Sequence, residues 1–170
     1  MKSDNNFPEF ENIINEMTYV YKHDNRPWLI GYSGGKDSSL LVTLVVETVL
    51  RLPEYARTKK IFIVTSDTGV ENPVVKKYMH SSSEKINIFS KKVRANIQAD
   101  IIYPDVTQSF WSLIIGLGYP TPEPPGFRWC TERLKILPMN KYTNSLIEQY
   151  GEVILLLGCL LYTSDAADEL

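Results

Sequence analysis

The sequence has little cysteine, no long hydrophobic run and almost no net charge. Its 170 residues include two cysteines, Cys130 and Cys159, which are too few for a disulfide framework or for a four-thiolate metal site. The sequence contains no run of about 18 apolar residues, the length that a helix needs to span a bilayer, and the N-terminus has no signal-peptide core. We therefore expect a cytoplasmic protein without membrane contact. The formal net charge of −2 gives no overall attraction to nucleic acid, so a role on DNA would need a local basic patch or a partner.

What the sequence does contain is an alternation of apolar strand-like runs with helical periodicity. The composition, 44% hydrophobic and 22% charged, is typical of a globular domain. Strands alternating with helices predict an α/β fold, a parallel sheet with helices on both faces. The expected strands are 28–32, 61–65, 98–103 and 152–157; the expected helices are about 7–24, 37–52, 73–92, a buried one at 107–117, and two from about 131 that are separated by a break at Pro138.

A glycine turn joins the first expected strand to the second expected helix. It reads Ser33-Gly34-Gly35-Lys36-Asp37-Ser38. Paired glycines let the backbone turn sharply and approach a ligand, and the N–H groups at a helix start attract anions. Lys36 adds a positive charge suited to phosphate. A Walker A loop would need glycine at position 30 and serine or threonine at position 37, but Ile30 and Asp37 stand there. The GxGxxG pattern of dinucleotide-binding folds is also absent.

The hexapeptide SGGKDS resembles the PP-loop signature of the ATP pyrophosphatase superfamily. The resemblance implies that residues 33–38 bind the phosphates of ATP, that ATP is cleaved between its α and β phosphates, and that the adenylate passes to a substrate oxygen. Lys36 and Asp37 are then candidate catalytic residues, and a Mg²⁺ ion bridging the phosphates is expected. Asp37 either orients that ion or caps the helix.

A second motif follows the strand 61–65 and reads SDTGVENP over residues 66–73. Ligands in open α/β sheets bind outside the carboxyl ends of strands, so Asp67 and Thr68 are expected to contact ATP or its metal. The motif is similar to one in the phosphoadenosine-phosphosulfate (PAPS) reductase branch of the superfamily. The alternative is an ordinary turn, since Asp and Gly are common turn residues. His80, in the helix that follows, is interpreted as a packing or surface residue.

A third motif, FRWCTERLK at 127–135, follows a proline-rich loop. It places Cys130 among three cations, Arg128, Arg133 and Lys135, an environment that favours the thiolate. Cys130 is therefore a candidate catalytic residue, as a sulfur carrier or nucleophile, and the three cations are candidates for holding an anionic substrate. The alternative is a buried structural cysteine.

Taken together, residues 1–158 resemble the DndC-type sulfurtransferases of bacterial DNA phosphorothioation systems. The resemblance depends on GYSGGKDSS at 31–39, TSDTGVENP at 65–73, QSFW with GYP at 108–120, and GFRWCTERLK at 126–135. It implies that ATP activates a DNA backbone phosphate so that sulfur replaces a non-bridging oxygen. The implied partners are DNA, a cysteine desulfurase that donates sulfur, and other phosphorothioation-system proteins. Members also carry a [4Fe–4S] cluster, whose ligands are not assignable here because the chain has one credible cysteine, Cys130.

The C-terminal residues 159–170 differ in character from the rest. CLLYTSDAADE resembles the translation of a transposase-end adapter used in sequencing libraries, so we expect the PP-loop domain, 1–158, to be incomplete at its C-terminus. Two other functions stay open: a PAPS reductase-like oxidoreductase that acts on a sulfonucleotide, and a non-catalytic ATP-binding subunit. Sulfite release would indicate the first, and ATP binding without pyrophosphate release would indicate the second.

Overall fold

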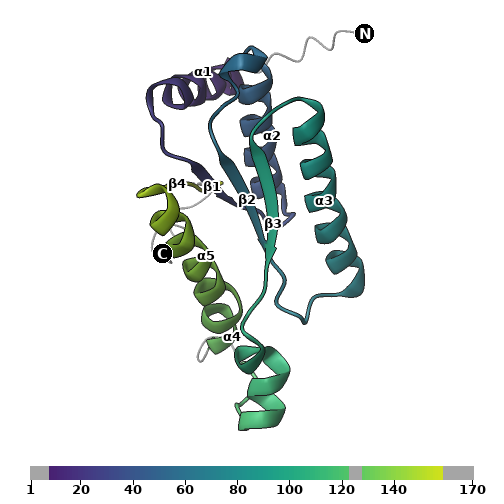
Figure 1. Ribbon diagram of the computed structural model, residues 1–170. Coiled ribbons are helices and arrows are strands. Elements are labelled where there is room, and N and C mark those ends of the chain that lie inside the picture. The colour runs from purple at the N-terminus through teal and green to yellow at the C-terminus, as the bar shows by residue number, and fades with distance from the viewer. Residues whose placement is uncertain (1–7, 123–127, 159–170) are drawn as a thin grey trace.

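The computed structural model describes residues 8–122 and 128–158, and they form a parallel sheet with helices on both faces (Figure 1). The strands are β1 (Trp28–Gly31), β2 (Ile61–Ser66), β3 (Ile97–Ile102) and β4 (Ile154–Leu156). They lie in the order β3-β2-β1-β4, and every neighbouring pair is parallel. The predicted α/β fold class is confirmed. The expected tail at 159–170 lies outside the described residues.

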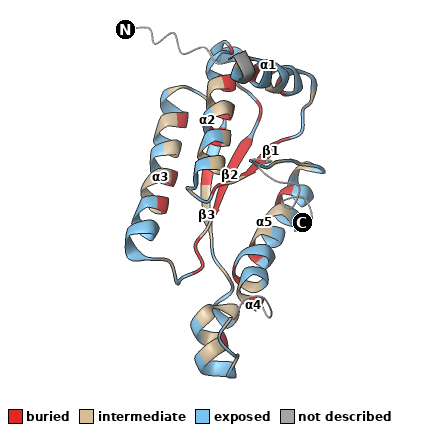
Figure 2. Ribbon diagram, turned by 180° about the vertical axis from the view of Figure 1, so that it is seen from behind, coloured by how far each residue is buried: buried red, intermediate tan, exposed pale blue. Residues whose placement is uncertain are grey.

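One face of the sheet is covered by α1 (Pro8–His23), α2 (Lys36–Leu50) and α3 (Pro73–Lys92) (Figure 1). Strand side chains at alternate positions, such as Trp28, Ile30 and Ile63, pack there against Val45 and Val49 of α2. These five side chains are at most 1% exposed. Burial on both faces explains why β1 and β2 read as continuous apolar runs, and Figure 2 shows the buried residues concentrated in these strands and in the sheet-facing sides of the helices.

The opposite face is covered by α5 (Leu137–Tyr150), whose Leu146 packs on Leu29, Phe62 and Val64. This cover does not extend over β4, where Leu155 stays 53% exposed. The last strand therefore has an exposed apolar side chain at Leu155. Among the described helices, none is long and apolar enough to cross a bilayer.

The predicted helix break at Pro138 is wrong. The backbone stays helical from α4 (Trp129–Thr131) through a π-helical turn, η4 (Glu132–Ile136), into α5. Proline lacks an N–H and its ring crowds the carbonyl four residues earlier, here that of Leu134. The wider π turn relieves this conflict, and the Ser66 hydroxyl donates a hydrogen bond of 3.1 Å to the Leu134 carbonyl. The carbonyl to which Pro138 cannot donate a hydrogen bond is thereby hydrogen-bonded to the end of β2.

The segment after β3 also differs from its prediction as a buried helix. It forms a 3₁₀ turn, η2 (Val106–Gln108), and a π-helical turn, η3 (Ser112–Gly116). Leu113 is buried, but Ile115 is 78% exposed. An all-round apolar pattern predicts burial on every side, whereas here one side packs inward and the other faces outward.

Candidate nucleotide-binding site

The glycine turn lies where the connections of the sheet reverse direction. From β1 the chain proceeds to β2 and β3 on one side, while β4 joins β1 on the other. The crevice outside the carboxyl ends of strands at such a reversal is the usual ligand site of open α/β sheets. Residues 33–38 follow β1 directly and lead into α2, so the sheet holds the predicted phosphate loop at this position.

Two serines brace the loop. The Ser33 hydroxyl accepts a hydrogen bond from the Gly35 N–H (3.3 Å), and the Ser38 hydroxyl donates to the Gly35 carbonyl (3.2 Å). The two hydroxyl oxygens lie 3.2 Å apart. Gly34 has φ +76°, and a Cβ placed on it would lie 3.1 Å from Tyr78 Cε1 of α3. Internal hydrogen bonds therefore hold the loop in one conformation, which requires a residue that tolerates positive φ at position 34.

We expect Gly34→Ala to destabilise the protein by about 1–2 kcal/mol, because a side chain is strained at positive φ and crowds Tyr78. Thermal melting monitored by circular dichroism measures the effect. Gly116→Ala is a matched control, since no atom lies within 4 Å of the point that its Cβ would occupy and its φ is not positive. Equal melting temperatures for the two variants would contradict the structural role of Gly34.

The start of α2 is arranged to receive an anion. Its N-cap, Gly35, has extended backbone and no side chain caps the helix. First-turn N–H groups without an intrahelical partner, together with the helix dipole, favour negative charge at this point. Lys36, at the first position of α2, is exposed. The predicted phosphate-binding residues thus lie together in one turn.

Asp37 does not cap α2, whose N-cap is Gly35 and which has no side-chain cap, and its role in orienting Mg²⁺ stays a prediction. Its Oδ1 atom is buried and has no hydrogen-bond partner among the described residues. Mg²⁺ is commonly held by one or two carboxylates together with substrate phosphates and waters. Within 8–122 and 128–158, no group of three or more His, Cys, Asp or Glu side chains is placed to hold a metal ion.

A cavity of about 580 Å³ adjoins the loop and is predominantly apolar. The ends of β1, β2 and β4 line it, together with the starts of α3 and α5; its apolar side chains include Val64, Val75, Met79, Ile136, Met139 and Leu157. Ser33, Ser66, Glu71, Lys135 and Asn140 place polar groups around it. A largely apolar cleft with a few polar groups is the usual form of a small-molecule site.

Asp67 is the centre of a cluster at the end of β2. Its side chain is fully buried, and its Oδ2 atom lies 3.2 Å from Lys76 Nζ and 3.2 Å from His80 Nε2. The Gly69 N–H donates to Oδ1 at 2.9 Å. Burial raises the pKa of Asp67, but the Gly69 N–H, His80 and Lys76 outweigh it and hold the pKa below its usual value. Asp67 is therefore an ionised carboxylate that contacts the Lys76 ammonium and the His80 ring.

His80, interpreted as a packing or surface residue, has a side chain that is 41% exposed, and its ring also contacts the buried Asp67 carboxylate. Lys76 was missed altogether. Lys76 and His80 are four residues apart in α3 and so share a helix face. This spacing was the sequence signal that both side chains could contact one carboxylate. Thr68 is buried too, and its hydroxyl donates to Glu71 Oε1 at 2.9 Å, which holds the turn before α3.

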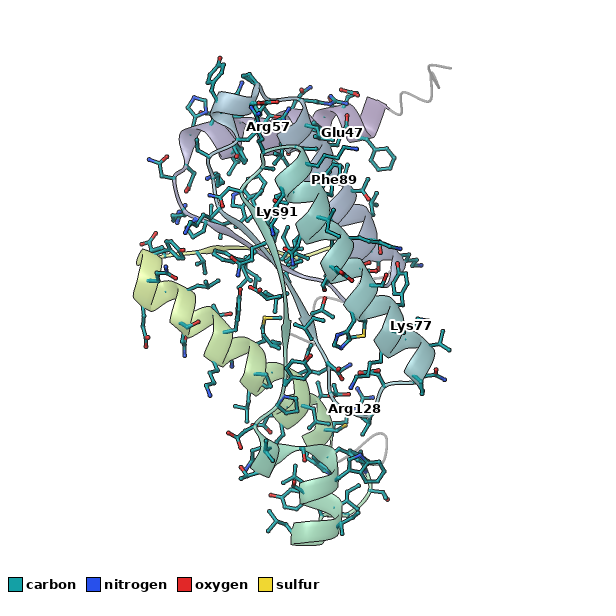
Figure 3. The ribbon with its side chains drawn as sticks, turned by 45° about the vertical axis from the view of Figure 1, so that its right-hand side comes forward. Glu47, Arg57, Lys77, Phe89, Lys91 and Arg128 are labelled. Carbon is teal, nitrogen blue, oxygen red and sulfur yellow. The ribbon has the colours of Figure 1, made fainter. Side chains whose placement is uncertain are left out.

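The three cations expected to surround Cys130 do not form one group. Lys135 lines the apolar cavity, whereas Arg133 lies on another side of the helix and donates a hydrogen bond to Gln108 Oε1. Arg128 is exposed and lies at the same end of the molecule as Lys77 (Figure 3). Cys130 is half-buried and is not among the residues that line the cavity. Its sulfur-carrier or nucleophile role stays a prediction.

Trp129 anchors this segment. Its indole N–H donates to the Pro120 carbonyl at 2.9 Å, and its ring stacks on Phe110 with ring centroids 5.7 Å apart. The QSFW and FRWC motifs are thereby packed together. The expected [4Fe–4S] cluster does not fit the described residues, because it needs about four thiolates and Cys130 is the one cysteine that they contain.

Comparison with known proteins gives one distant match. An uncharacterized protein of Methanocaldococcus jannaschii is 28% identical over 153 residues, which cover 90% of this chain and 27% of the relative. The chain thus spans about a quarter of that protein's length. No protein-family model matches the chain, and no solved structure matches it.

Proposed function

We propose that this protein is an ATP pyrophosphatase that activates a phosphate of the DNA backbone for sulfur transfer in the cytoplasm. The observation that carries the proposal is the position of SGGKDS: an uncapped helix start with Lys36 and an unpartnered Asp37 oxygen, beside an apolar cavity at the reversal point of the sheet. The resemblance to DndC-type sulfurtransferases supports the choice of DNA as acceptor and of a cysteine desulfurase and other phosphorothioation-system proteins as partners.

In this proposal the phosphates of ATP bind to the loop and the adenine binds in the cavity. The β and γ phosphates lie against the N–H groups of residues 33–38, and the adenine lies between Val75 and Met139 in the apolar cavity. Asp37 holds Mg²⁺, which neutralises part of the phosphate charge. Thr68 and Asp67 support the neighbouring turn, whose Glu71 reaches the cavity.

The chemical step transfers the adenylate. A non-bridging oxygen of the acceptor phosphate attacks the α phosphorus of ATP, the bond to the β phosphate breaks, and pyrophosphate leaves. Negative charge develops on that leaving group, where Lys36 and the first-turn N–H groups of α2 stabilise it. The terminal sulfur of a donor persulfide then attacks the activated phosphorus, and the P–O bond to AMP breaks so that the oxygen departs on AMP. A thiol co-substrate reduces the remaining S–S bond to the donor, which leaves the phosphorothioate and a disulfide.

Pyrophosphate release from ATP and Mg²⁺, measured with and without a DNA duplex, tests the proposal. We expect release that DNA stimulates. Release of sulfite from a sulfonucleotide, with no pyrophosphate from ATP, would replace the proposal by a PAPS reductase-like activity. ATP binding without release in either condition would replace it by a non-catalytic subunit.

Filling the cavity gives a separate prediction. Val75 lies in the first turn of α3, lines the cavity and is 43% exposed, so a larger side chain there meets little packed structure. We expect Val75→Trp to weaken binding of a fluorescent ATP analogue at least tenfold, or about 1.4 kcal/mol, with little change in melting temperature. Val74→Trp is the matched control, because Val74 is more exposed and is not among the residues lining the cavity. Equal affinities of the two variants would place the adenine elsewhere.

A further inference from the structure

A second cavity, of about 420 Å³, lies at the carboxyl end of β3. The segment after β3 supplies Tyr103, Thr107 and Gln108, and the helix that contains the π turn supplies Arg133 and Lys141. Residues 135, 136, 139 and 140 of that helix line the nucleotide cavity, while residues 133, 137, 138 and 141 line this one. One helix therefore separates two cavities that share no lining residue.

The second cavity is suited to an anion. Arg133 has a planar fork of N–H donors, and Gln108 Oε1 is its one hydrogen-bond partner within 8–122 and 128–158, so donors remain for a ligand. The guanidinium carbon lies 5.6 Å from the centre of the Tyr119 ring, within the range of a cation–π contact. Within the same ranges, neither Arg133 nor Lys141 forms an ion pair with a carboxylate.

The carboxylate in this cavity, that of Asp105, already accepts hydrogen bonds from Thr107. Asp105 Oδ1 accepts hydrogen bonds from the Thr107 N–H (2.9 Å) and the Thr107 hydroxyl (2.7 Å), and so caps the 3₁₀ turn η2. The hydroxyl and the N–H of Thr107 lower the pKa of Asp105, and the nearby charge of Lys141 contributes. With Asp105 ionised, the cavity still carries one more positive than negative side chain.

We propose that this cavity binds a second phosphate of the acceptor strand, on the other side of the dividing helix from the phosphate that reacts in the nucleotide cavity. The inference rests on the proposed function, which supplies an acceptor with repeated phosphates. A phosphodiester polymer carries a charge at regular short intervals, so it engages cations on both sides of the dividing helix, whereas a mononucleotide occupies one cavity. Arg133 supplies bidentate contacts to the phosphate oxygens and Lys141 a point charge.

The test is the binding of a fluorescein-labelled DNA duplex, measured by fluorescence anisotropy over a range of salt concentrations. For the double variant Arg133→Gln/Lys141→Gln we expect affinity to fall at least tenfold. The magnitude of the slope of log K against log salt should also decrease by about 1, for the one phosphate that is no longer neutralised. Lys91→Gln/Lys92→Gln is the matched control, since it removes the same two positive charges from the last turn of α3, and neither lysine lines the second cavity. Equal losses in both double variants would overturn the proposal.

Two further measurements separate the alternatives. Because Arg133 contacts Gln108 and Tyr119, its replacement can disturb packing. Lys141→Gln alone, at an exposed position, should still weaken duplex binding and reduce the magnitude of the salt slope, by less than the double variant does. Saturating ATP or excess inorganic phosphate should not displace the duplex; displacement by either would mean a shared site or a site for free phosphate, and would overturn the inference. Failure of the wild-type protein to bind a fluorescent ATP analogue would instead count against the proposed function.

Discussion

Lys36→Ala is expected to reduce pyrophosphate release from ATP by about 10²–10³-fold, the usual cost of removing one preorganised group that stabilises charge on a leaving oxygen. Lys36 occupies the first position of α2, directly after the Gly34-Gly35 turn, where phosphate charge meets the helix start. The loss should be mainly in kcat, because charge on the pyrophosphate increases as the bond breaks.

Lys91→Ala is the control for this variant. It removes the same charge and the same side chain from the last turn of α3, and Figure 3 shows Lys91 toward the opposite end of the molecule from Arg128. Its turnover should equal that of the unmodified protein. Unchanged turnover in Lys36→Ala would mean that the SGGKDS turn does not bind the departing pyrophosphate.

Asp67→Ala should destabilise the protein by about 2–4 kcal/mol, because it removes a buried carboxylate and leaves three donors without their acceptor. These are the Gly69 N–H, Lys76 Nζ and His80 Nε2. For a domain of this size the melting temperature should fall by roughly 5–15 °C. Differential scanning calorimetry measures it, with Asp100→Ala as the control carboxylate on the neighbouring strand, where Tyr142 and Gln98 are the partners.

The same carboxylate predicts a pH dependence. The folded-state pKa of Asp67 is lower than its unfolded value, so its contribution to stability is complete above the unfolded pKa of about 3.9 and is lost as the pH falls through the folded pKa. The difference in melting temperature between the unmodified protein and Asp67→Asn should therefore be constant near neutral pH and shrink below about pH 4. A difference that grows on acidification would contradict the ionised Asp67.

The α/β fold class and the glycine turn after β1 were predictable because both depend on local sequence. Central parallel strands are buried on both faces, so Ile61–Ser66 reads as a continuous β-rich run, and α3 begins at Pro73 as its sequence indicates. The turn at Gly34 and Gly35 is likewise set by residues next to one another. These features require no knowledge of how distant segments pack.

The partners within the site were less predictable because they depend on helix rotation. Arg133 and Lys135 are two residues apart, so on a helix they point to different sides, and grouping them around Cys130 neglected this geometry. The contact of Lys76 and His80 with Asp67 depends on the face that α3 turns toward β2. The π turn before Pro138 likewise reflects a long-range contact, the hydrogen bond from Ser66 to the Leu134 carbonyl.

The most direct test of the central claim is identification of the products of ATP turnover by ³¹P NMR, with Mg²⁺ and a DNA duplex present. Cleavage between the α and β phosphates predicts AMP and pyrophosphate in equal amounts, with both products much reduced in Lys36→Ala. ADP and inorganic phosphate would show cleavage between the β and γ phosphates. That result would contradict the assignment of residues 33–38 as a pyrophosphate-binding loop.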